Sequence, residues 1–173
     1  MQSRIRLLAV AMLTLVLAGC GKSSEDAVSD RSVAPPLMAA TLGVQTVLRV
    51  EEYRAQARYD DADRDDGAVQ AQICRACHSF DEGGPDMIGP ALYGIFGTRV
   101  GSRDRYEYSP VMRNANFVWT PRALDGWLAQ PGKFLPGNRM TFAGVMRQSD
   151  RDDLVAYLLA VTSVADSSNN KKD

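Results

Sequence analysis

The chain has 173 residues and a formal net charge of -1, with 45% hydrophobic and 24% charged residues. Its length suits one domain of about 100–150 residues with additional segments at the ends. So balanced a charge gives no indication of nucleic-acid binding, and the composition is that of an ordinary globular domain rather than a disordered or membrane-spanning chain.

Residues 1–19 have the pattern of an export signal. Arg4 and Arg6 precede an almost wholly apolar run over residues 7–18. That run is too short for a helix that crosses a bilayer core, which needs roughly 20 apolar residues. A basic start followed by a short apolar run is typical of a signal peptide.

The segment Leu17-Ala18-Gly19-Cys20 resembles the lipobox of bacterial lipoproteins. In that family the signal is cut before the cysteine, which is then acylated, and two or more acyl chains give stable anchoring. The alternative is ordinary cleavage that leaves a free thiol at Cys20. We expect lipidation, and with it a tether in the periplasm. Gly21 is not an acidic retention signal, which favours the outer membrane over the inner one.

The next segment, residues 20–60, is expected to be the lipidated N-terminus and a linker. Residues 21–40 are rich in Ser, Asp, Ala and Pro, as linkers are. Residues 41–59 form either a short helix or a partly ordered extension. The acidic cluster over residues 60–66 is interpreted as a solvated boundary, so the main domain is expected at residues 61–164.

Within that domain the pattern is helical. Residues 68–77 are predicted to form a helix, and the glycines and prolines of 80–90 predict a loop. Thr120 and Pro121 mark a helix start, and that helix must stop by Pro131. Ser149, with an acidic residue three positions later, predicts the N-cap of a last helix.

No alternating pattern predicts a sheet, and the polar tail 165–173 is expected to be disordered. The expected fold is all-α, with about four to five helices and long loops.

The segment CRACH contains Cys74, Cys77 and His78, and His78 is the one histidine of the chain. Two thiols three positions apart, followed at once by an imidazole, suit covalent attachment of one haem c. The thiols form thioethers with the two vinyl groups, and the histidine binds one axial face of the iron. A haem attached in this way becomes a large part of a small domain's core.

Other uses of these residues fit less well. A redox-active CxxC belongs in a βαβ context, for which no strands are predicted. A structural zinc site needs four ligands, and this cluster supplies three. A disulfide between Cys74 and Cys77 leaves His78 without a role.

A six-coordinate iron needs a second axial ligand, and no second histidine exists. A methionine thioether is the usual alternative. The candidates are Met87, Met112, Met140 and Met146, any of which could instead pack in the core. Met140 is favoured because Pro136 and Gly137 precede it in an irregular loop.

Over roughly residues 67–161 the chain resembles class I cytochrome c, of the mitochondrial cytochrome c and bacterial cytochrome c2 type. The resemblance is carried by CRACHSF, GPALYGIFGTRVG, YEYSPVM, TPRALDGWLAQP, KFLPGNRMTFAG and DRDDLVAYL, in the family's order and spacing.

The resemblance implies His78 and Met140 as axial ligands. It also implies that the Pro90 carbonyl fixes the ring of His78 and that Tyr108 and Trp119 hydrogen-bond a haem propionate. Asn138 would form a hydrogen bond inside the haem crevice, and Phe142 would shield the haem edge. Several positions depart from the mitochondrial pattern, including Gln70, where the N-terminal helix usually has an aromatic residue four positions before the first haem cysteine. Trp127 replaces a tyrosine beside the methionine sulfur, and Met112 replaces an asparagine. Thr98 replaces an arginine, whose place the neighbouring Arg99 could take.

The expected function is that of a one-electron carrier without a small-molecule substrate or catalytic residues. Its partners would be membrane-bound redox proteins, such as a quinol-cytochrome c reductase, a dehydrogenase or a terminal oxidase. Lys133, Arg139 and Arg147 would give modest steering toward an acidic partner. The alternatives are a haem enzyme or sensor with a displaceable methionine, and a fixed cytochrome subunit of an oxidase or dehydrogenase.

Overall fold

The computed structural model of the protein describes residues 36–164. The predicted signal peptide, Cys20 and the polar tail 165–173 lie outside these residues. The helices, in chain order, are η1 (Ala39–Thr41), α1 (Val50–Arg54), α2 (Ala57–Asp60), α3 (Arg64–Gln70), α4 (Gln72–Arg75), α5 (Pro110–Asn114), α6 (Pro121–Ala129), α7 (Pro131–Phe134) and α8 (Gln148–Val161). No strand occurs within residues 36–164, where one isolated bridge joins Arg99 and Val118.

The all-α prediction is therefore confirmed. The helical residues are divided into more segments than the four to five expected, because α1, α2, α4, α5 and α7 are only four or five residues long. None of the helices in the described part of the chain is long and apolar enough to cross a membrane.

The helix expected over residues 68–77 is observed as α3 and α4, and it starts earlier. The carboxylate of Asp63 accepts hydrogen bonds from the backbone N–H groups of Asp65 and Asp66, both at 3.0 Å, and so caps α3. The acidic cluster 60–66 is thus partly a helix start rather than only a solvated boundary, because acidic side chains suit a helix N-terminus.

Helix α6 begins and ends as predicted. The hydroxyl of Thr120 accepts from the Ala123 N–H at 3.2 Å, Pro121 occupies the first turn, and Pro131 follows the end. The N-cap predicted for α8 is wrong. This helix starts at Gln148, so Ser149 lies inside it and caps nothing.

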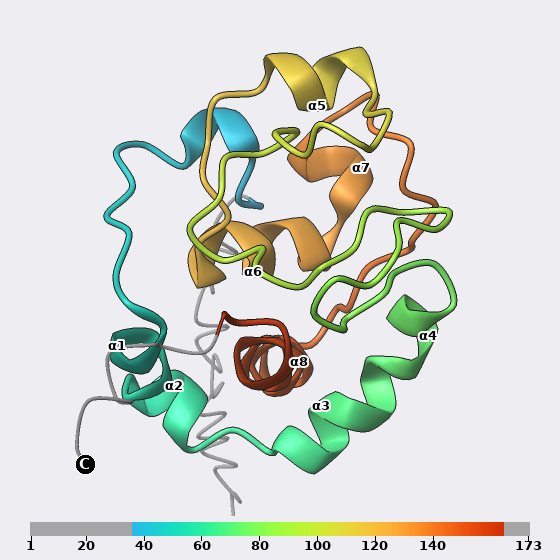
Figure 1. The fold of residues 1–173 in the computed structure, drawn as a ribbon. Coiled ribbons are helices and arrows are strands. Elements are labelled where there is room, and N and C mark those ends of the chain that lie inside the picture. The colour runs from blue at the N-terminus through green and yellow to red at the C-terminus, as the bar shows by residue number, and fades with distance from the viewer. Residues whose placement is uncertain (1–35, 165–173) are drawn as a thin grey trace, which may run out of the picture. The chain divides into compact units, whose positions relative to one another are not determined.

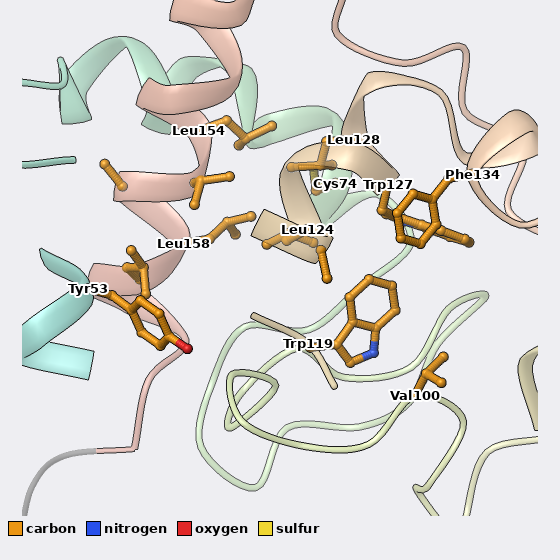
Figure 2. Close-up of a cluster of buried hydrophobic side chains, with 14 of the residues drawn as sticks. Tyr53, Cys74, Val100, Trp119, Leu124, Trp127, Leu128, Phe134, Leu154 and Leu158 are labelled. Carbon is orange, nitrogen blue, oxygen red and sulfur yellow. The ribbon is translucent and has the colours of Figure 1, made fainter. Parts of the chain in front are cut away.

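Helix α8 lies at the centre of the packing, where it contacts α1, α2, α3 and α6 (Figure 1). It contributes the buried leucines Leu154, Leu158 and Leu159 (the first two are labelled in Figure 2). Gly67 on α3 makes the closest approach. A Cβ added there would lie 2.2 Å from the carbonyl oxygen of Asp153, so only glycine lets the two helices come so near.

Residues 36–60, here called the strap, pack on the same core. Leu42, Tyr53 and Tyr59 are only 3%, 6% and 4% exposed. The strap runs from η1 along one side of the molecule to α1 and α2, which lie beside α8 (Figure 1). The strap thus packs its aromatic side chains on the core beside α8, on the N-terminal side of the boundary predicted at residue 61.

Candidate functional site

One cavity of about 280 Å³ lies between α4, α6, α8 and the loops that join the helices. Its lining includes all ten residues that the sequence pointed to as cofactor-binding: Cys74, Cys77, His78, Pro90, Tyr108, Trp119, Trp127, Asn138, Met140 and Phe142. The fold thus brings together side chains that are up to 68 positions apart, counted from Cys74 to Phe142.

The CRACH segment forms one wall of the cavity. The N–H groups of Cys77 and His78 donate to the carbonyl of Cys74 at 3.0 and 2.9 Å, which continues the turn of α4 and carries both thiols and the imidazole to the same wall. Both cysteines are free thiols. Burial raises the pKa of Cys74, so its sulfur is held as the neutral thiol.

The imidazole of His78 is fixed by its neighbours. Its Nδ1 lies 2.6 Å from the carbonyl oxygen of Pro90, which can only accept, so Nδ1 carries the proton and Nε2 keeps a free lone pair. A Cβ on Gly89 would lie 2.2 Å from Cε1 of His78, so glycine is required for this close approach. Burial lowers the pKa of His78, although the bond to Pro90 acts in the opposite direction. The ring is therefore held as a neutral imidazole whose Nε2 carries no proton.

Met140 is held in the cavity wall by two neighbouring side chains. The indole Nε1–H of Trp127 donates to Sδ of Met140 at 3.2 Å. The amide of Asn138 accepts from the Met140 N–H at 2.9 Å and donates to the carbonyls of Pro131 and Leu135, both also at 2.9 Å. Asn138 thus shapes the loop that presents the methionine. Trp127 stands where the family pattern has a tyrosine beside the methionine sulfur, and its indole donates a hydrogen bond to that sulfur.

Aromatic rings support this wall from behind. Trp127 packs edge-to-face on Trp119, with ring centres 5.5 Å apart, and on Phe134 at 6.0 Å (Figure 2). All three side chains are less than 8% exposed. Such T-shaped pairs limit the motion of the indole that donates to Met140.

Two further departures have local explanations. Thr98 donates to the carbonyl of Ile95 at 2.6 Å, and Arg99, which also lines the cavity, donates to the carbonyls of Arg113 and Ala115. Met112 lines the cavity as a buried apolar side chain.

Several polar lining residues were missed by the sequence reasoning, among them Arg103 and Ser109. Arg103 donates to the carbonyl of Tyr93. The hydroxyl of Ser109 is buried and has no hydrogen-bond partner among the described residues. A serine before Pro110 is typical of a helix start and indicates no binding role for Ser109.

The cavity fits a covalently attached haem. It combines two free thiols, an imidazole with a free Nε2 lone pair and a thioether with aromatic and aliphatic walls. The buried, unpartnered hydroxyl of Ser109 is one polar group that a bound molecule would satisfy, because buried hydroxyl groups rarely lack a partner.

The chain was compared with known proteins, and no family model matches it. It is 42% identical over 93 residues to a cytochrome c homolog of Bradyrhizobium diazoefficiens, which covers 53% of this chain and 50% of that protein. It is 36% identical over 86 residues to cytochrome c of Kluyveromyces lactis, covering 50% of this chain and 78% of that protein. Cytochrome c2 of Agrobacterium tumefaciens is 40% identical over 96 residues, 54% of this chain and 86% of that protein.

The chain therefore spans about half the length of the Bradyrhizobium relative and most of the length of the other two. The matched identity lies well above 30% over more than three quarters of two short relatives. On these grounds the chain belongs to the cytochrome c family, whose members are electron-transfer proteins with covalently bound haem c rather than enzymes.

Proposed function

We propose that this chain is a one-electron carrier in which Cys74 and Cys77 hold one haem c and His78 and Met140 are the axial ligands. The single observation that carries the proposal is the presence of all four side chains in the lining of one cavity, with both ligand side chains already held by hydrogen bonds. A bound haem supplies an iron that gains or loses one electron. With both axial positions filled, no substrate site remains on the metal.

The residues of the chain would then keep the site rigid during transfer. Pro90 holds the His78 ring and its tautomer, and Trp127 holds the Met140 sulfur at a fixed place. Asn138 keeps the loop of Met140 closed. An iron whose two axial ligands are held in this way needs little rearrangement when it gains or loses an electron.

Tyr108, Trp119 and Phe142 are proposed to complete the haem environment. Tyr108 is half-buried in the lining, and burial raises the pKa of its hydroxyl, so it stays a neutral donor for a propionate. Trp119 is assigned the same role through its indole N–H, which makes no hydrogen bond within residues 36–164. Phe142, half-buried in the same lining, would shield the haem edge from water.

The location and partners are part of the same proposal. The export signal and the lipobox at Cys20 support a periplasmic protein tethered to a membrane, with the outer membrane preferred. A tether raises the local concentration of a carrier near membrane-bound redox partners, such as a quinol-cytochrome c reductase, a dehydrogenase or a terminal oxidase. Replacement of Cys20 by serine should release the protein from the membrane fraction without changing its visible spectrum.

The decisive test of ligation is visible absorption of the exported, haem-loaded protein. We expect a far-red sulfur-to-iron band in the ferric state and no spectral change when carbon monoxide is added to the ferrous state. Met140→Ala should abolish the band, lower the reduction potential and allow carbon monoxide to bind. Met87→Ala, at an exposed position outside the cavity lining, is the matched control.

The opposite result would support the alternative of a haem enzyme or sensor. It would consist of a missing far-red band and rapid carbon monoxide binding in the unmodified protein. Stable co-purification with one complex at high salt would instead indicate a fixed cytochrome subunit.

A further inference from the structure

The strap contains one side chain that pairs with the backbone of a distant segment. Nε2 of Gln45 donates to the carbonyl of Val118 at 2.8 Å, and its Oε1 accepts from the Val118 N–H at 2.8 Å. Nε2 also lies 3.2 Å from the hydroxyl of Thr120. One side-chain amide thus satisfies both backbone groups of a residue 73 positions away, as a neighbouring strand would.

The same segment is bonded on its other edge by an adjacent loop. The Trp119 N–H donates to the carbonyl of Thr98 at 2.9 Å, and the Gly97 N–H donates to the carbonyl of Trp119 at 2.9 Å. The loop thus binds one edge of residues 118–120. Gln45 binds the other edge at Val118, the residue just before Trp119.

This segment carries a wall of the cavity. Trp119 lines the cavity and packs on Trp127, whose indole donates to the sulfur of Met140. Thr120 caps α6, the helix that carries Trp127. A shift of the Val118 backbone would therefore reach both indoles through direct contacts.

Gln45 is itself held firmly in place. Leu42 is buried, and its carbonyl accepts from Arg122 of α6 at 2.9 Å. On the other side, the hydroxyl of Tyr53 donates to the carbonyl of Thr46 at 3.2 Å and accepts from the Leu48 N–H at 2.9 Å. The chain is thus fixed both before and after Gln45.

We propose that Gln45 is a positioning residue for the cavity wall, acting through the Val118 and Thr120 backbone on Trp119 and, through it, on Trp127. The proposal rests on the proposed haem site only for its redox readout. Without Gln45 the wall loosens, and water reaches the site more easily. A wetter site favours the more highly charged ferric state, so the reduction potential falls.

The test uses the full-length, haem-loaded protein with Gln45→Ala and Gln45→Glu. We expect Gln45→Ala to lower the reduction potential, weaken the far-red band and speed amide hydrogen exchange at Val118 and Trp119 by about tenfold. Gln45→Glu keeps the acceptor, loses both donated bonds and sets a carboxylate oxygen against the Val118 carbonyl, so its effects should have the same direction. Gln56→Ala, which removes an exposed glutamine of the same strap, should change none of these quantities.

A lower melting temperature with unchanged potential, far-red band and Trp119 exchange would overturn the proposal, since Gln45 would then only fasten the strap. If the unmodified protein lacks the far-red band, the proposed ligation fails instead. In that case Trp119 exchange still decides the role of Gln45: a rate unchanged in both variants overturns it, and a faster rate supports it.

Discussion

Helix α6 lines the cavity with one face and contacts the strap with the other, and the two faces make different kinds of interaction. On the cavity side, Leu124, Trp127 and Leu128 line the pocket, and their contacts are apolar apart from the bond from Trp127 to Met140. Shape and ring geometry hold this side together.

On the strap side several of the contacts are polar. Arg122 donates to the carbonyl of Leu42, and Asp125 forms ion pairs with Arg58 of the strap at 3.0 Å and with Arg151 of α8 at 2.8 Å. Gly126 leaves room for Leu37, because a Cβ there would lie 2.9 Å from that side chain. The comparison indicates that the cavity wall depends on packing, while α6 is joined to the strap by a few paired polar groups in addition to the buried apolar side chains of the strap.

The largest effect is expected from Trp127→Ala on the cavity side. Removal of a buried indole that touches two aromatic rings leaves a large void and should cost about 3–5 kcal/mol of unfolding free energy. Denaturant unfolding of the haem-loaded protein measures this loss. Trp127→Phe keeps most of the packing and removes only the donor to Met140, so it should shift the reduction potential with a much smaller loss of stability. Equal losses of stability in both variants would contradict the division of roles.

The next effect is expected from Asp125→Ala on the strap side. It leaves the buried guanidinium of Arg151 without its carboxylate partner, which should cost about 3 kcal/mol. Asp150→Ala, which removes an exposed pair with Arg147, should cost less than about 1 kcal/mol in the same denaturant experiment. Similar losses in the two variants would show that the buried pair has no special role.

Acid should lower the stability of the protein through the same carboxylate, that of Asp125. Burial would raise the pKa of Asp125, but hydrogen bonds from Arg151 and Gln148 and the charge of Arg58 lower it overall. A carboxyl whose folded pKa is lowered adds stability above its unfolded pKa of about 4, and that stability is lost as the pH falls through the folded pKa. Asp125→Ala should therefore reduce the acid-dependent loss of stability.

A smaller effect, confined to alkaline pH, is expected from Tyr59 in the strap. Burial raises its pKa to about 12, well above the ordinary value of 10.0. The unfolded chain then loses this proton at lower pH than the folded protein, so stability should fall by about 1.4 kcal/mol per pH unit between pH 10 and 12. Tyr59→Phe should flatten this slope in denaturant unfolding followed by far-ultraviolet circular dichroism. An unchanged slope would assign the alkaline loss to other groups.

The cavity side could be predicted from the sequence, and the strap side could not. CRACH, the loop before Met140 and the Thr120–Pro121 helix start are local patterns. The structure brings the side chains that they carry or position to one cavity, namely Cys74, Cys77, His78, Trp127 and Met140. The contacts of Gln45, Arg58 and Asp125 join residues far apart in the chain, and a polar residue has no periodicity that marks its partner. For residues 41–59 the sequence therefore predicts no more than a short helix or a partly ordered extension, although their aromatic residues are buried.

The smallest effect concerns charge at the mouth of the cavity. Of the three cations expected to steer a partner, Arg139 lies 3.9 Å from Glu107 and Arg147 lies 2.8 Å from Asp150, so their positive charge is largely offset nearby. The rate of oxidation by ferricyanide, a multiply charged anion, should therefore fall only about twofold to threefold between low and physiological salt. Glu107→Gln frees Arg139, so it should steepen this salt dependence, whereas oxidation by a cationic cobalt complex should become slower at low salt. A fall of more than tenfold in the unmodified protein would show that the mouth is strongly positive, and an electrostatic docking surface would then have to be assigned there.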